Sequence, residues 1–170
     1  MIKVGDKIKV IYPDKDMPYQ AAVITLSDKG SRGERVDTSG PKASEILREH
    51  GFEIIEEILL PDEMAQIKKE LIRLSDSRQV DLIITTGGTG LSPRDCTPEA
   101  TLAVADRNVP GIAEAIRAGS MTITKRAMLS RGVSVTRKKT LIINLPGSKK
   151  AVEERLSFII AQLPHGLDTL

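Results

Sequence analysis

Aromatic residues are scarce in this chain, whose 170 residues include two tyrosines, two phenylalanines and no tryptophan. The core must therefore be built from aliphatic side chains, and a surface on which nucleic-acid bases could stack is not expected. There is only one cysteine. It excludes a disulfide within one chain and is typical of a protein from a reducing cytoplasm.

A strong charge of either sign is also absent, because 25 basic and 23 acidic residues give a formal net charge of +2. The basic residues are scattered rather than clustered, so no nucleic-acid partner is expected. No apolar stretch approaches the ~20 residues of a membrane helix, and the N-terminal sequence lacks the apolar run of a signal peptide. We expect a cytoplasmic protein without a membrane segment.

The order of the expected elements predicts the fold class. Nearly continuous apolar runs at 21–26, 52–60 and 80–85 predict strands that are covered on both faces. Between them, apolar residues at helical spacing predict one helix capped by Asp37 or Thr38 and another that begins near Asp62. This alternation favours a three-layer α-β-α fold with a largely parallel central sheet.

Further elements are expected in the second half of the chain. Thr97 is a candidate N-cap, and residues 102–104 are candidates for burial in the helix that follows. Residues 132–136 and 140–144 are expected to be neighbouring strands, and Ser148 is expected to open a final helix.

Residues 21–170 are expected to form one domain, since domains usually contain about 100–200 residues. Residues 1–20 precede it as an extension. Within the extension, residues 7–10 alternate between charged and apolar side chains, which indicates a short strand with one wet face. The sequence of the extension indicates no role.

The most informative segment is Thr86-Gly87-Gly88-Thr89-Gly90, which lies between a buried strand and the helix expected at Thr97. A strand, a bare backbone and a helix N-terminus together form an arrangement that binds anions. Glycines leave backbone N–H groups open to a ligand, and the threonines and Ser92 add hydroxyl donors. The segment matches neither a Walker A loop nor the dinucleotide fingerprint. A tight turn that only requires positive φ explains the glycines equally well.

Four segments follow strands and are expected to meet at the carboxyl edge of the sheet, where open parallel sheets bind ligands. They are Ser27-Asp28, Pro61-Asp62, residues 86–95 and residues 144–148. Asp62 and Asp95 lie on neighbouring loops and together could hold Mg²⁺, with Asp28 as a weaker third candidate. Alternatively, Asp62 caps its helix and Asp95 forms an Asx turn before the next helix.

Other polar residues carry weaker signals. Arg94 could face an anion or only solvent, and Ser130-Arg131 could simply end a short helix. Cys96 is interpreted as a packing residue, because an acidic neighbour does not lower the pKa of a thiol. His50 and His165 have no metal-ligand partner at a useful spacing and are expected at the surface.

Several motifs in combination resemble the molybdopterin-binding (Mog-type) family. These motifs are Thr85-Thr86-Gly87-Gly88-Thr89-Gly90, Pro93-Arg94-Asp95, Thr97-Pro98-Glu99-Ala100-Thr101, Leu129-Ser130-Arg131 and Asn144-Leu145-Pro146-Gly147-Ser148. The resemblance implies a largely parallel α/β fold that assembles as a homotrimer. It also implies Mg²⁺-dependent adenylylation of molybdopterin by ATP, with release of pyrophosphate and hand-over of the product to a protein that inserts molybdate.

The same resemblance implies roles for particular residues. Asp62 and Asp95 correspond to the family's important aspartates, as the catalytic pair and the Mg²⁺ ligands. The implied substrate-binding residues are Ser27, Asp28, Thr86, Gly87, Gly88, Thr89, Gly90, Ser92, Pro93, Arg94, Thr97, Ser130, Arg131, Asn144, Pro146, Gly147 and Ser148. One branch of the family shares the fold without a clear activity, and residues 93–98 are more similar to the adenylyltransferase branch.

Two alternatives stay open on the sequence alone. A carrier of the same fold would bind molybdopterin without turning over a nucleotide. A different nucleotidyltransferase would use ATP with another acceptor. Since adenylylation precedes metal insertion, the sequence also does not distinguish a molybdenum pathway from a tungsten pathway.

Overall fold

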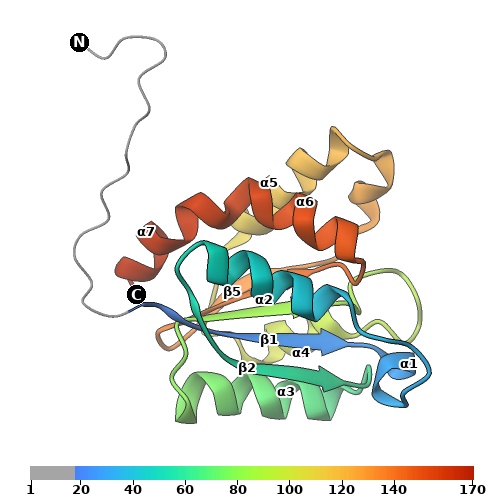
Figure 1. The fold of residues 1–170 in the computed structure, drawn as a ribbon, viewed down its shortest axis with the longest axis horizontal. Helices are drawn as coiled ribbons and strands as arrows, with labels where there is room; N and C mark the ends of the chain where they lie inside the picture. Colours follow the sequence, from blue (N-terminus) through green and yellow to red (C-terminus); the bar gives the residue numbers. More distant parts are fainter. Residues whose placement is uncertain (1–17) are drawn as a thin grey trace.

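The computed structural model describes residues 18–170, which form a three-layer α/β fold (Figure 1). The central sheet has the strand order β2-β1-β3-β6-β5-β4. The strands are β1 (Gln20–Leu26), β2 (Glu53–Leu60), β3 (Leu82–Thr86), β4 (Arg107–Asn108), β5 (Ser134–Arg137) and β6 (Thr140–Leu145). Strands β2, β1, β3 and β6 are parallel, and β5 pairs antiparallel with both β6 and β4. The predicted fold class is confirmed.

Helices cover both faces of the sheet (Figure 1). One face carries α3 (Met64–Ile72), which continues as a π-helical turn (Arg73–Ser77), and α4 (Thr97–Val104). The other face carries α2 (Ser39–Glu49), α5 (Pro110–Met121), α6 (Lys149–Ile159) and α7 (Leu163–Asp168). The short helical segments are α1 (Asp28–Ser31), η2 (Lys125–Leu129) and η3 (Ile160–Gln162).

The sheet separates two aliphatic cores. Because successive side chains of a strand point to opposite faces, Leu82 and Ile84 of β3 pack on the α2 and α6 side. Ile83 packs on the α3 and α4 side. All three side chains are fully buried, and each such burial contributes about 1.5–3 kcal/mol. This arrangement explains why the central strands read as continuous apolar runs rather than as alternating ones.

Most of the expected elements in the second half are confirmed. Strands β5 and β6 pair as a hairpin. The Ser148 side chain caps α6 by accepting a hydrogen bond from the Ala151 amide at 3.1 Å. Three short elements were not foreseen, namely α1 in the expected loop after β1, the two-residue strand β4, and α7. The strand expected at residues 7–10 lies outside the described residues, and the division into an extension and a domain stays a prediction.

Two predicted helix caps are wrong. Cys96 occupies the N-cap position of α4, while Thr97 is fully buried and donates its Oγ1 hydroxyl to the Gly87 carbonyl at 3.0 Å. Glu63 occupies the N-cap position of α3, while the Asp62 carboxylate turns toward Asp28. Thr97 is thus used inside the connection from β3 to α4, and Asp62 is used for a contact with the loop after β1, which no local pattern reveals.

The burial prediction for α4 is also partly wrong. Val104 is buried, but Leu102 and Ala103 are exposed, and Ala100 and Thr101 take the inward face instead. Among residues 18–170, no helix has both the length and the apolar character needed to cross a membrane.

Candidate functional site

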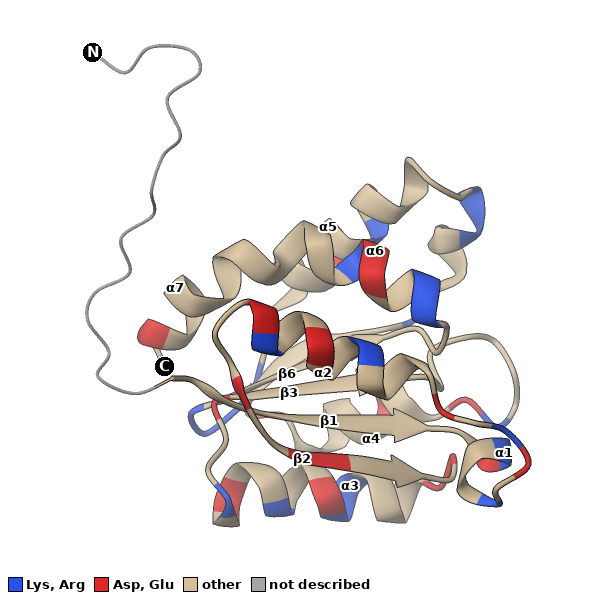
Figure 2. Ribbon diagram, in the orientation of Figure 1, with Lys and Arg blue, Asp and Glu red and all other residues tan. Residues whose placement is uncertain are grey.

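A cavity of about 680 Å³ opens at the carboxyl edge of the parallel strands. The loops that follow β1, β2, β3 and β6 all contribute to its wall, as expected from the sequence. Residues of both charge signs gather here, in α1 and in the loops beyond the strand ends (Figure 2). The cavity therefore combines open backbone with carboxylates and guanidinium groups, which suits a polar, anionic ligand.

The glycine turn requires glycine for its own geometry. Gly87 and Gly88 have φ values of +96° and +67°, a region that other residues rarely adopt. A Cβ on Gly87 would collide with the Leu26 carbonyl, and one on Gly88 would collide with Thr97 Oγ1 and lie 2.9 Å from Asp62 Oδ1. The turn is thus pressed between β1, α4 and Asp62, and its backbone forms part of the cavity wall.

Asp62 and Asp28 hold each other through their backbones. The Asp28 amide donates to Asp62 Oδ2 at 3.2 Å, and the Asp62 amide donates to Asp28 Oδ1 at 3.0 Å. The second oxygen, Asp62 Oδ1, is buried and has no hydrogen-bond partner among residues 18–170. Burial raises the pKa of Asp62 above its ordinary value, and the charges of Asp28 and Asp95 act in the same direction. An orphaned carboxylate oxygen of this kind favours binding of a cation or a proton.

Arg94 bridges three loops at the mouth of the cavity. Its Nε and Nη2 donate to the two carboxylate oxygens of Asp28 at 2.9 and 3.0 Å, and Nη2 also donates to Glu63 Oε1 at 2.7 Å. The hydrogen bonds from Arg94 are the largest cause that lowers the pKa of Asp28 to about 2. In this structure the Arg94 guanidinium therefore pairs with the carboxylates of Asp28 and Glu63.

Asp95 closes the loop that follows the glycine turn. Its Oδ2 accepts a hydrogen bond from the Ser92 amide at 3.0 Å, so the carboxylate bonds the residues before it and does not form the Asx turn that was the alternative interpretation. Arg131 holds the same loop from behind by donating to the carbonyls of Gly90 and Asp95 at 2.7 and 2.9 Å and by pairing with Glu99. These contacts fix the backbone at Asp95 and so help to position its carboxylate.

The structure sorts the site residues inferred from the sequence into two groups. The cavity is lined by Ser27, Asp28, Asp62, Gly87, Gly88, Thr89, Gly90, Ser92, Arg94, Asp95, Ser130, Pro146, Gly147 and Ser148. The residues outside the lining are Thr86, Pro93, Thr97, Arg131 and Asn144.

Two of the residues outside the lining support the wall from within the fold. Thr86 is buried and shares a hydrogen bond of 2.9 Å with Ser39. The Asn144 amide nitrogen donates to Thr85 and Thr101 at 2.9 and 3.0 Å. Both therefore link neighbouring strands and helices behind the cavity.

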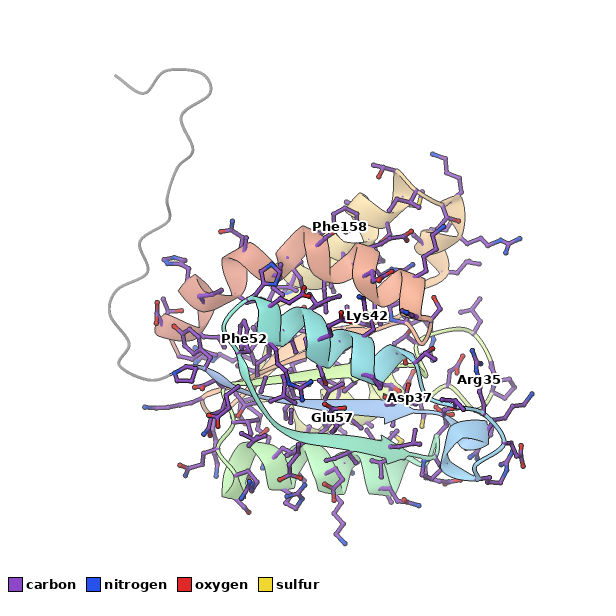
Figure 3. The ribbon with its side chains drawn as sticks, in the orientation of Figure 1. Arg35, Asp37, Lys42, Phe52, Glu57 and Phe158 are labelled. Atoms are coloured by element: carbon purple, nitrogen blue, oxygen red, sulfur yellow. The ribbon has the colours of Figure 1, made fainter. Side chains whose placement is uncertain are left out.

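A further part of the wall was not expected from the sequence. It comprises Thr25, Leu26, Lys29, Gly30, Arg35, Val36, Asp37, Thr38 and Ser39, together with Arg126, Leu129 and Arg155. Arg35 and Asp37 lie on the segment from α1 to α2, beyond the ends of β1 and β2 (Figure 3).

One of the missed residues carried a signal in the sequence. Asp37 Oδ1 accepts hydrogen bonds from the amides of Ser39 and Gly40, so the expected capping of α2 by Asp37 is confirmed. Its Oδ2 accepts from Thr25 Oγ1 at 2.6 Å, which ties the segment to β1. A cap at the start of a helix that follows a strand end could have placed this segment at the site.

The weaker candidates behave as expected. Cys96 packs against the core on the α3 and α4 side, and burial raises the pKa of its thiol. His50 and His165 are exposed. Among the described residues, no group of three or more His, Cys, Asp or Glu side chains could hold a metal. A Mg²⁺ ion that arrives with phosphates needs only one or two carboxylates, and Asp62 Oδ1 at the cavity wall is a buried oxygen without a hydrogen-bond partner among residues 18–170.

Residues 22–165 match the family described as probable molybdopterin binding domain. Molybdopterin adenylyltransferase of Helicobacter pylori is 39% identical over 150 residues, which cover 87% of this chain and 85% of the relative. Molybdopterin adenylyltransferase of Escherichia coli is 44% identical over 137 residues, which cover 79% of this chain and 70% of the relative.

A solved structure gives the same result. The molybdopterin biosynthesis enzyme MoaB of Thermus thermophilus superposes with a TM-score of 0.85 at 48% identity, over 89% of this chain and 95% of that chain. Residues 22–165, which match the family, include the glycine turn and the loops that build the cavity. The resemblance inferred from the motifs is confirmed, and this chain belongs to the molybdopterin-binding domain family.

Proposed function

We propose that this protein is a molybdopterin adenylyltransferase, which transfers AMP from ATP to molybdopterin in the biosynthesis of the molybdenum cofactor. The observation that carries the proposal is the orphaned Asp62 Oδ1, which is buried against the glycine turn at the wall of the cavity. Molybdopterin adenylyltransferase of Escherichia coli, which is named for this activity, is 44% identical to the chain over 137 residues. The activity named for this relative and the polar cavity of the chain therefore support the same proposal.

The proposed reaction needs no nucleophile from the protein. An oxygen of the terminal phosphate of molybdopterin attacks the α-phosphorus of ATP, the bond from that phosphorus to the bridging oxygen breaks, and pyrophosphate leaves. The task of the protein is to position two anionic substrates and to offset their charge. The backbone amides of the glycine turn and the hydroxyls of Thr89 and Ser92 are the donors for phosphate oxygens.

Asp62 and Asp95 would hold Mg²⁺, which offsets phosphate charge when it is bound. The donor set fits, because Asp62 offers a buried oxygen without a partner and Asp95 lines the same cavity. The raised pKa of Asp62 fits as well, because a carboxylate that burial disposes to bind a proton would also be stabilised by a bound cation. Asp28 and Arg94 would keep the loop that carries Asp62 in place.

The decisive experiment is a pyrophosphate-release assay with purified protein, molybdopterin, ATP and Mg²⁺. Release that requires all three additions supports the proposal. Binding of molybdopterin without release would instead identify a carrier, and release without molybdopterin-dependence would indicate another acceptor. Assembly as a homotrimer, a cytoplasmic location and hand-over to a molybdate-inserting protein are proposed on the same family basis.

A further inference from the structure

One cation in the cavity wall has no role in the chemistry described so far. Arg155 on α6 lines the cavity although its residue surface is only 9% exposed. Its Nε donates to Ser120 Oγ of α5 at 3.1 Å. Within residues 18–170, Nη1 and Nη2 have no hydrogen-bond acceptor, and Arg155 forms no ion pair. Neither nitrogen is fully enclosed, and Arg155 is part of the cavity lining.

This situation differs from that of the other partly buried arginines. Arg73 pairs with Glu56 and Glu70, and Arg137 pairs with Asp76. Arg117 donates to the carbonyl of Gly132 at 2.8 Å. Burial of a guanidinium without an acidic partner is unfavourable, and burial accordingly lowers the pKa of Arg155. A protein that keeps such a group beside a cavity can recover the lost interaction when an anion binds.

The charges around Arg155 do not satisfy it. Glu154 is its neighbour on α6 and attracts it electrostatically, but the Glu154 carboxylate pairs with Lys150 at 3.8 Å. Arg126 of η2 lines the same wall and forms no ion pair with a described residue. The carboxylates of the cavity belong to the loops after β1, β2 and β3. The part of the wall formed by α6 and η2 therefore carries cations without an acidic partner among the described residues, whereas the opposite loops carry both charge signs, with Lys29, Arg35 and Arg94 beside the carboxylates.

We propose that Arg155, together with Arg126, forms a subsite for a phosphate group of a substrate. A guanidinium presents paired N–H donors that match the geometry of phosphate oxygens, and a water-poor wall strengthens the interaction. The identity of the substrate rests on the proposed function, under which both ATP and molybdopterin carry phosphate. The binding of phosphate itself does not depend on that function.

The first test is a calorimetric titration of the full chain with inorganic phosphate and with pyrophosphate. We expect Arg155→Met to bind these ions at least about tenfold more weakly than wild type, because charge-assisted hydrogen bonds are lost. Lys125→Gln is the matched control, since it removes one positive charge from an exposed side chain of η2 outside the cavity lining. It should bind as wild type does. Equal binding by Arg155→Met, or no binding by wild type, would overturn the proposal.

Thermal unfolding distinguishes a ligand-binding arginine from a structural one. In the absence of phosphate, Arg155→Met should unfold at the same temperature as wild type or higher, because a buried cation without an acidic partner has been removed. Phosphate should raise the Tm of wild type but not of the variant. A variant with a lower Tm and an unchanged response to phosphate would show that Arg155 is structural and would contradict the subsite.

Arg126→Gln provides a second variant in case Arg155→Met does not fold, because Arg126 is exposed. We expect it to weaken phosphate binding with an unchanged Tm, and wild-type affinity in this variant would contradict its part in the subsite.

Steady-state kinetics then identify the source of the phosphate. A higher KM for ATP alone assigns the subsite to the nucleotide, and a higher KM for molybdopterin alone assigns it to the acceptor. Wild-type KM values for both would overturn the assignment to a substrate. If wild type released no pyrophosphate, the proposed function would fail, while the phosphate titration would still decide whether the subsite exists.

Discussion

Asp28 and Asp62 exchange hydrogen bonds, each accepting the backbone amide of the other through one carboxylate oxygen. The exchange joins the loop after β1 to the loop after β2, although the two residues lie 34 positions apart in the chain. It uses only Oδ2 of Asp62 and leaves Oδ1 buried beside the glycine turn. Asp28 therefore acts as a support, and Asp62 presents the oxygen that remains.

Replacement of either proposed catalytic carboxylate should abolish most activity while the protein stays folded. For Asp62→Asn and for Asp95→Asn we expect pyrophosphate release to fall by about 100-fold or more, a typical effect of losing one electrostatic contribution at a reacting centre. Asp62→Asn should not lower stability, because it removes a buried charge. Glu45→Gln, an exposed change on α2 outside the cavity lining, is the control. Wild-type turnover in both aspartate variants would refute their assigned roles.

The ion pair between Asp28 and Arg94 should make stability depend on pH in acid. The pKa of Asp28 is lowered from 3.8 to about 2 in the folded protein. A lowered folded-state pKa contributes stability above the unfolded value, and this contribution is lost as the pH falls from about 4 to about 2. Urea unfolding should therefore show wild type more stable than Asp28→Asn near neutral pH, with the difference vanishing over that window. A difference that is independent of pH would argue against the ion pair as its cause.

The glycine turn should tolerate no side chain at Gly88. We expect Gly88→Ala to cost about 2–4 kcal/mol, because it combines an unfavourable backbone conformation with a collision against Thr97. Gly111→Ala is the matched control, since a Cβ there would meet nothing within 4 Å and the residue lies in the first turn of α5. That change should be neutral or stabilising by up to about 1 kcal/mol. Free energies of unfolding measured in urea compare the two.

Asp37 and Thr38 should differ sharply in their effect on stability. Asp37 caps α2 and bonds Thr25, so Asp37→Ala should destabilise the protein by about 2 kcal/mol. Thr38 occupies the N-cap position of α2 but its side chain makes no capping hydrogen bond, so Thr38→Ala should change little. Thermal unfolding of the two variants checks the pair, and equal losses would contradict the capping role given to Asp37.

The parts of the fold that are set by burial were predictable, and the parts set by contacts between loops were not. The run Leu82-Ile83-Ile84 is apolar because both faces of β3 are covered, and that single cause made the strand visible in the sequence. Thr97 and Asp62 look like caps by position, but Thr97 bonds the Gly87 carbonyl 10 positions earlier, and Asp62 bonds Asp28, which lies 34 positions away. Arg155 looks like one more charged residue of a terminal helix, and only the packing of α6 against α5 reveals its burial.

The pairing of Arg94 with both Asp28 and Glu63 couples the binding of a nucleotide to the binding of a cation. If a nucleotide phosphate takes over Arg94, the carboxylates of Asp28 and Glu63 lose their counter-charge. The acidic side of the cavity then attracts a cation more strongly than before. We therefore expect nucleotide and divalent cation each to increase the affinity for the other, a reciprocal coupling that begins with one arginine shared among three loops.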